Sequence, residues 1–185
     1  SDSRSAPRTA FGGMVSMGGQ LYFLRRNERQ RGELWRSDGT AQGTIRIVEL
    51  PATDFGAIGA LQVLGNRLYF PWHTNETGAE LWSSDGSAAG TGMVIDLWPG
   101  TGSSSPEELV PVGSGAYFRA DDGTRGVEFW YLSAPGAVPV PVPDIAPAGL
   151  GLDAVTKTVE GNRLIVVDLN LQNSLGITCI THGLP

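Results

Sequence analysis

The chain has 185 residues, a formal charge of −6, only 17% charged side chains and 26 glycines. This length can bury the core of one domain, and low charge with abundant glycine favours a turn-rich β protein over a helical one. The acidic balance argues against nucleic-acid binding, which needs basic residues to neutralise phosphates, and no run of about 18 apolar residues predicts a membrane span.

A repeat of 47 or 48 residues runs through the chain. Its clearest column is an apolar triplet that recurs as Leu21-Tyr22-Phe23, Leu68-Tyr69-Phe70, Ala116-Tyr117-Phe118 and Leu164-Ile165-Val166. Thirteen residues after each central residue stand Trp35, Trp82, Trp130 and, in degenerate form, Thr178. A period of this length is typical of propellers and solenoids. We therefore treat residues 1–185 as one domain with repeats at about 11–50, 58–98, 107–145 and 152–185.

Four strands are predicted in order within each repeat, and the second repeat shows them best. The first is the short apolar run 60–64, and the second, 67–72, alternates and is rich in aromatic residues. The third, 80–83, leads into the tight-turn dipeptide Asp85-Gly86, and the fourth covers 93–97. Four short antiparallel strands per unit indicate a propeller blade, so we predict an all-β propeller of about four four-stranded blades.

Other arrangements remain open. The same pattern fits a β-sandwich, half of a larger dimeric propeller, or a piece of a longer propeller. The fourth repeat reaches Pro185 before its outermost strand. Because closing a ring removes unpaired strand edges, we expect residues 5–10 to pair onto the fourth repeat.

Residues 32–44, with the sequence GELWRSDGTAQGT, resemble the ELWxSDGTxxGT tandem repeat of bacterial secreted and surface proteins. Residues 94–100 look like its VxDIxPG tail, and residues 121–126 like its DDGTxG turn. The Ser-Asp-Gly-Thr turn is also similar in placement to the Asp-box of sialidase-type propellers, which is a structural hairpin. The resemblance covers residues 11 to about 147. It implies a propeller-like fold in a secreted or cell-surface bacterial protein, and gives no support for glycosidase activity.

Side chains that recur in every repeat are expected to be structural. Trp35, Trp82 and Trp130 are predicted to pack between blades, where burial of an aromatic ring stabilises the fold. Two acidic columns also recur, Glu33, Glu80 and Glu128 together with Glu49, Asp96 and Asp144. Acids around a propeller axis could hold Ca²⁺, which prefers oxygen ligands. We favour instead hydrogen bonds to a neighbouring turn, or ion pairs with an arginine of the next blade.

Side chains that do not recur are better candidates for binding. The predicted ligand-binding residues are Trp72, Trp98, Tyr131 and His73. Trp72 and Trp98 lie at or near strand ends, where an exposed indole could stack on a sugar, although partial burial at a blade edge is the competing interpretation. Asp121 and Asp122 form the densest acidic turn and are the candidates for Ca²⁺.

No catalytic residues are predicted. Two histidines and the single Cys179, expected to be a buried thiol, give no zinc spacing, and no nucleophile elbow or phosphate loop occurs. The leading hypothesis is a secreted or cell-surface module that binds a glycan or protein partner through loops on one face. The alternatives are a hydrolase resembling glycoside hydrolases, with acids at the channel mouth, and a structural assembly component. A homodimer fits any of them.

Overall fold

The computed structural model describes residues 11–29, 31–52, 60–142, 155–160, 163–168 and 176–181. All regular structure in these ranges is antiparallel β-sheet, which confirms the predicted all-β class. The same ranges contain no helix that is long and apolar enough to cross a membrane.

Four sheets follow one another along the chain, each inside one sequence repeat. The first contains β1 (Phe11–Met17), β2 (Gln20–Arg26), β3 (Gly32–Ser37) and β4 (Ile45–Glu49). The second contains β5 (Gln62–Leu64), β6 (Arg67–Thr74), β7 (Gly78–Ser84) and β8 (Gly92–Met93). The third contains β9 (Glu107–Val112), β10 (Gly115–Asp121), β11 (Val127–Leu132) and β12 (Val140–Pro141). The fourth contains β13 (Val155–Glu160), β14 (Arg163–Asp168) and β15 (Gly176–Thr181).

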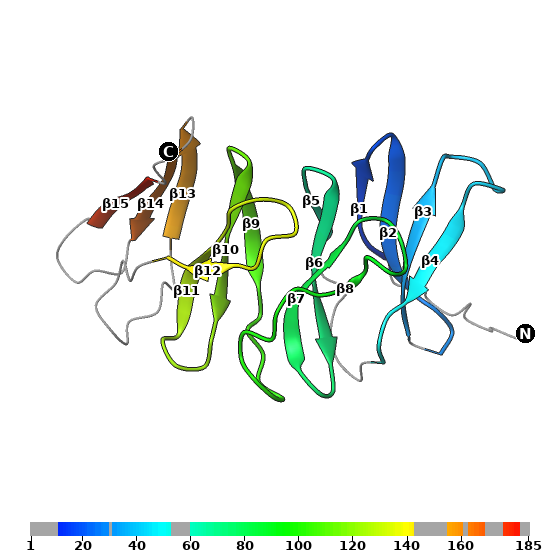
Figure 1. Cartoon of the computed structure of the whole chain (residues 1–185), viewed down its shortest axis with the longest axis horizontal. Coiled ribbons are helices and arrows are strands. Elements are labelled where there is room, and N and C mark those ends of the chain that lie inside the picture. Colours follow the sequence, from blue (N-terminus) through cyan, green and yellow to red (C-terminus); the bar gives the residue numbers. More distant parts are fainter. Residues whose placement is uncertain are drawn as a thin grey trace, which may run out of the picture.

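The sheets lie side by side in a row, with β1–β4 at one end and β13–β15 at the other (Figure 1). Three of them have four strands and the fourth has three described strands, each paired with its neighbour in chain order. The expected pairing of residues 5–10 with the fourth repeat lies outside the described residues.

The fourth strand of the second sheet is shorter than predicted. β8 covers only Gly92–Met93, whereas the sequence predicted a strand over 93–97. Val94 still donates to the Leu81 carbonyl at 2.8 Å, but the Leu97 N–H donates to the Glu80 carboxylate at 3.1 Å instead of to a strand. A buried side chain therefore draws the backbone out of the ladder.

Neighbouring sheets pack through the alternating side chains of their middle strands. In the first sheet Tyr22, Leu24 and Leu34 share one face, because paired residues of adjacent strands point to the same side. We call this face, which packs on the second sheet, the downstream face. The opposite face is the upstream face, and in the first sheet it carries Leu21, Phe23 and Trp35.

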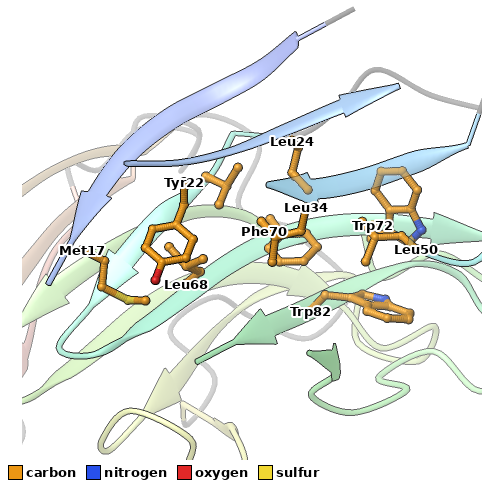
Figure 2. Close-up of a cluster of buried hydrophobic side chains, with 10 residues drawn as sticks. Met17, Tyr22, Leu24, Leu34, Leu50, Leu68, Phe70, Trp72 and Trp82 are labelled. Atoms are coloured by element: carbon orange, nitrogen blue, oxygen red, sulfur yellow. The ribbon is translucent and has the colours of Figure 1, made fainter. Parts of the chain in front are cut away.

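The core between the first and second sheets is shown in Figure 2. The downstream face of the first sheet meets an upstream face made of Leu68, Phe70, Trp72 and Trp82. Each of these four side chains is at most 9% exposed. Burial of a large apolar side chain contributes about 1.5–3 kcal/mol, so this interface stabilises both sheets.

The same arrangement recurs between the second and third sheets. Tyr69 on the downstream face of β6 belongs to one buried cluster with Phe118 and Trp130 of the third sheet. Trp82 and Trp130 therefore pack between sheets as predicted, whereas Trp35 is only partly buried.

The Ser-Asp-Gly-Thr segment forms the hairpin between the third and fourth strands, as predicted. In the first sheet the Asp38 carboxylate accepts the N–H and the hydroxyl of Thr40, both at 2.8 Å. Gly39 has a φ of +93°, a conformation that favours glycine. The Thr44 hydroxyl then donates to the Thr40 carbonyl at 2.6 Å. The most specific motif of the repeat is therefore used to close a turn.

Candidate functional site

The connection from the second to the third sheet, residues 97–105, is held by a buried carboxylate. Glu80 is 0% exposed and accepts the N–H of Leu97 at 3.1 Å, the N–H of Ser104 at 3.1 Å and the Ser104 hydroxyl at 2.6 Å. Burial raises the pKa of the Glu80 carboxyl group, and the bonds from Ser104 and Leu97 offset only part of that effect. Among the described residues, this repeated acid therefore binds the loop of its own connection and forms no ion pair with an arginine of the next sheet.

The end of that connection and the start of β9 have a constrained backbone. Ser105 and Glu108 have φ values of +46° and +56°, which are uncommon for residues with a side chain. The Ser105 N–H donates to the Ala79 carbonyl at 3.0 Å, and the Asp121 N–H donates to the Ser104 carbonyl at 2.9 Å. Bonds to both sheets therefore hold residues 104 and 105, including the unusual conformation of Ser105.

Trp98 lies against the acidic turn of the third sheet. Trp98 is 37% exposed, so the residue is partly buried and partly open to solvent. The ring lies over the backbone of Gly102 and Gly123, and a Cβ atom at Gly123 would come within 2.6 Å of it. Glycine at these two positions leaves the space that the ring occupies against the loop. The structure thus joins Trp98 to the turn of Asp121 and Asp122, while sugar binding there stays a prediction.

The Asp122 carboxylate is engaged by its own turn. One oxygen accepts the N–H groups of Thr124 and Arg125 at 2.9 Å and the Thr124 hydroxyl at 2.8 Å, and the other accepts the Arg125 guanidinium at 2.8 Å. Burial alone would raise the pKa of Asp122, but these donors outweigh it and hold the pKa well below its usual range. Asp121 accepts the N–H of Gly123 at 2.8 Å. Calcium binding by this pair stays a prediction, and a cation would compete with Arg125.

Across the part of the chain that the structure describes, no three His, Cys, Asp or Glu side chains gather as a metal site.

Trp72 is buried and is not a surface ring. It is 3% exposed, and its indole N–H donates to the Pro51 carbonyl at 3.2 Å. The ring fills the space that a side chain at Gly32 would occupy. The expectation of an exposed indole is therefore wrong for this residue. β6 continues to Thr74, and its alternation directs Trp72 into the core between the first two sheets.

Tyr131 and His73 are the remaining predicted binding residues. Tyr131 is 6% exposed and packs on Tyr117, with the ring centroids 4.7 Å apart. Burial and the adjacent Tyr131 raise the pKa of Tyr117 to about 12. His73 is partly exposed on β6 and pairs with Ala79 of β7. Tyr131 is therefore mainly a packing residue.

A cavity of about 280 Å³ lies between the second and third sheets, beside their first strands β5 and β9. Its apolar walls are Tyr69, Phe70, Pro71, Leu81, Leu109 and Phe118. The exposed Glu107 and Glu108 lie at its margin, next to the constrained backbone, and Gln62 adds an amide. The Tyr69 hydroxyl accepts the Gly136 N–H at 2.8 Å, which fixes the ring in the wall.

This lining suits binding of an apolar group that carries a neighbouring hydrogen-bond donor or positive charge. Among the described lining residues, the ionisable side chains are those of Tyr69, Glu107 and Glu108. The sequence did not predict the cavity because its walls come from two different repeats. Alignment of the repeats shows which positions are equivalent, but not which residues of neighbouring repeats face each other. The available signal was the pair Glu107-Glu108, two acids outside the repeated acidic columns.

Comparisons with known proteins bear on the fold alone. No family model matches the chain, and no curated protein is similar to it in sequence. The structure is similar to the crystal structure of TolB from Acinetobacter baumannii, with a TM-score of 0.53 and 13% sequence identity. The match covers 95% of this chain and 42% of the TolB chain, so this chain spans less than half of that protein. The similarity supports a propeller-like arrangement of the sheets.

Proposed function

We propose that the chain is a non-catalytic binding module that takes an apolar side chain of a partner protein into the cavity between the second and third sheets. The observation that carries this proposal is the composition of the lining, in which aromatic and aliphatic side chains stand beside the exposed Glu107 and Glu108. Apolar surface supplies affinity in such sites, and a few polar groups supply orientation.

The size and charge of the cavity define the partner further. A volume of about 280 Å³ is at the lower limit of small-molecule sites, which suits one large side chain of an extended peptide. The exposed carboxylate of Glu107, on a chain with a formal charge of −6, favours a basic residue beside that side chain. The proposed ligand is therefore a peptide with an aromatic or leucine anchor flanked by arginine or lysine.

The fixed backbone at the margin supports a binding role. Non-glycine residues at positive φ cost about 1–3 kcal/mol each, and such strain concentrates at functional sites. Here Ser105 and Glu108 keep that conformation beside the cavity, where the bonds of residues 104 and 105 hold the segment. A preformed margin lowers the entropy lost on binding.

Selection from a displayed random-peptide library on the full chain tests the proposal. We expect apolar anchors flanked by basic residues, and weaker binding to the Glu107→Lys variant by about tenfold, the effect of losing about 1.4 kcal/mol. Ala60→Phe, at an exposed lining position, should also weaken binding by filling the entrance. Glu76→Lys is the matched control, because it makes the same charge change on an exposed turn outside the lining. Peptides that bind both cavity variants as well as wild type would contradict the proposal.

Glycan binding is a second candidate, favoured by Trp98. Trp98 is 37% exposed and its ring lies on a glycine surface beside Asp121, an arrangement that offers a stacking face and a hydrogen-bond acceptor to a sugar. A glycan array probed with wild type and with Trp98→Ala separates the two candidates. Binding that is lost in Trp98→Ala and retained in Glu107→Lys would select the glycan.

A further inference from the structure

The upstream face of the first sheet is exposed where the equivalent faces of the next two sheets are buried. Leu21 is 39% exposed, whereas Leu68 and Ala116 at the same repeat position are 0% exposed. Met14, which pairs with Phe23 on this face, is 60% exposed. In the described part of the chain, neither hydrophobic cluster between sheets includes these first-sheet side chains. Exposed apolar side chains on a sheet face, here beside the ion pairs of Arg25 and Arg46 with Glu33, are typical of an interaction site.

The repeat shows what covers such a face. The second sheet's upstream face is covered by the downstream face of the first sheet, and the third sheet's by that of the second. At the repeat positions of Tyr22, Leu24 and Leu34, the fourth sheet has Ile165, Val167 and Ile177. Its register pairs Val167 with Ile177, as Leu24 pairs with Leu34. The fourth sheet thus has apolar residues at the repeat positions that, in the first sheet, cover the upstream face of the next sheet.

The positions of the first and fourth sheets in the row favour a contact between two chains over one within a single chain. β13–β15 lie at the opposite end of the row from β1–β4 (Figure 1). The charged groups of the exposed face are already paired, since Arg25 and Arg46 each bond Glu33 at 3.1 Å. Arg25 also lies 4.6 Å from the centroid of the Trp35 ring. These charges therefore stay paired when a partner covers the face, at a cost in desolvation of Arg25 and Arg46, whose side chains are 34% and 50% exposed.

We propose that the fourth sheet of a second copy packs on the upstream face of the first sheet. The reciprocal contact then closes a ring from the four sheets of each copy. Head-to-tail contacts of this kind form a closed assembly when the rotation between copies closes. Eight sheets are within the range of known propellers, and the ring leaves neither end of the row exposed. The inference is independent of the ligand proposed above.

Light scattering after size-exclusion chromatography of the whole chain tests the inference. We expect twice the 19.5 kDa mass of one chain. Leu21→Glu and Met14→Glu should each raise the dimer dissociation constant at least about tenfold, without a change in the far-ultraviolet spectrum. The control is Val138→Glu, which adds the same charge at a 62% exposed position outside this face and should leave the dimer intact.

Three results would overturn the inference. The first is a wild-type mass of one chain at every concentration, which would show that the face is bare or covered from within. The second is a Leu21→Glu or Met14→Glu dimer as stable as the Val138→Glu dimer. The third is a mass that rises without limit, because contacts that do not close form chains and exclude the two-copy ring.

Discussion

The first and second sheets place the same repeat residues in opposite surroundings. Glu33 and Glu80 share one repeat position, yet Glu33 bonds arginines whose side chains are 34% and 50% exposed, and Glu80 bonds a buried loop. Burial would raise the pKa of Glu33, but the donors Trp35, Asn27 and Arg46 and the charge of Arg25 outweigh it, so its pKa is lowered. Burial dominates at Glu80, and its pKa is raised.

Trp35 and Trp82, which also share one repeat position, differ because their surroundings differ. The Trp35 indole N–H donates to Glu33 at 2.9 Å, whereas Glu80 is occupied by the loop at 97–104. The buried indole nitrogen of Trp82 has no hydrogen-bond partner among the described residues. The repeat therefore determines the strand position of a side chain. The neighbouring sheet and loop determine its burial, its hydrogen-bond partners and the direction of its pKa shift.

The largest expected difference is between the two tryptophans. Trp82→Ala removes a ring that is 9% exposed in the core between sheets, and should lower the free energy of unfolding by about 3–5 kcal/mol. Trp35→Ala should cost less than half as much, because the ring is partly exposed and loses its contacts with Phe23, Arg25 and Glu33 outside a core between sheets. Urea unfolding at a concentration where the chain is monomeric measures both. Equal losses would show that the first sheet's upstream face is covered within one chain.

The glutamates should respond to pH with opposite signs. The lowered pKa of Glu33 gives stability that is present above the reference value of 4.5 and is lost as the pH falls through the folded-state pKa. The raised pKa of Glu80 gives stability that is present below 4.5 and is lost as the pH rises through the folded-state pKa. On acidification, the difference in free energy of unfolding between wild type and Glu33→Gln should therefore move against the wild type. The difference between wild type and Glu80→Gln should move in favour of the wild type.

Urea unfolding of the wild type and both variants from neutral pH to about pH 3, below the usual glutamate pKa, measures these differences. Each glutamine variant serves as the control for the other, since both remove one titrating group at the same repeat position. Curves that shift in the same direction would mean that the two environments are alike.

The features that sequence predicted are the ones encoded locally. The triplet columns and the Ser-Asp-Gly-Thr motif place strands and hairpins because each depends on residues within a few positions of one another. Trp72 was predicted to lie at a strand end because the strand was predicted to cover 67–72, whereas β6 continues to Thr74 and keeps Trp72 inside the strand. The short β8 was missed because Glu80, far from it in the sequence, binds Leu97.

The candidate site was less predictable for a related reason. Trp98 and the acidic turn were both singled out, but their contact depends on how the connection folds back across Gly102 onto Gly123. The cavity depends on the spacing of two sheets, which no single repeat encodes.

The smallest expected effect concerns a part of the repeat where the two sheets should not differ. Asp38 accepts the N–H and hydroxyl of Thr40, and Asp85 accepts those of Ser87 at 2.9 and 2.7 Å. These bonds are internal to exposed turns, so Asp38→Ala and Asp85→Ala should lower the melting temperature equally, by no more than a few degrees. Calorimetry measures both, and Asp85→Asn, which keeps an acceptor oxygen without the charge, shows whether hydrogen bonding suffices. A clearly larger loss at Asp85 would mean that the neighbouring sheet also stabilises this turn, with Tyr22, whose hydroxyl approaches Gly86, as the contact responsible.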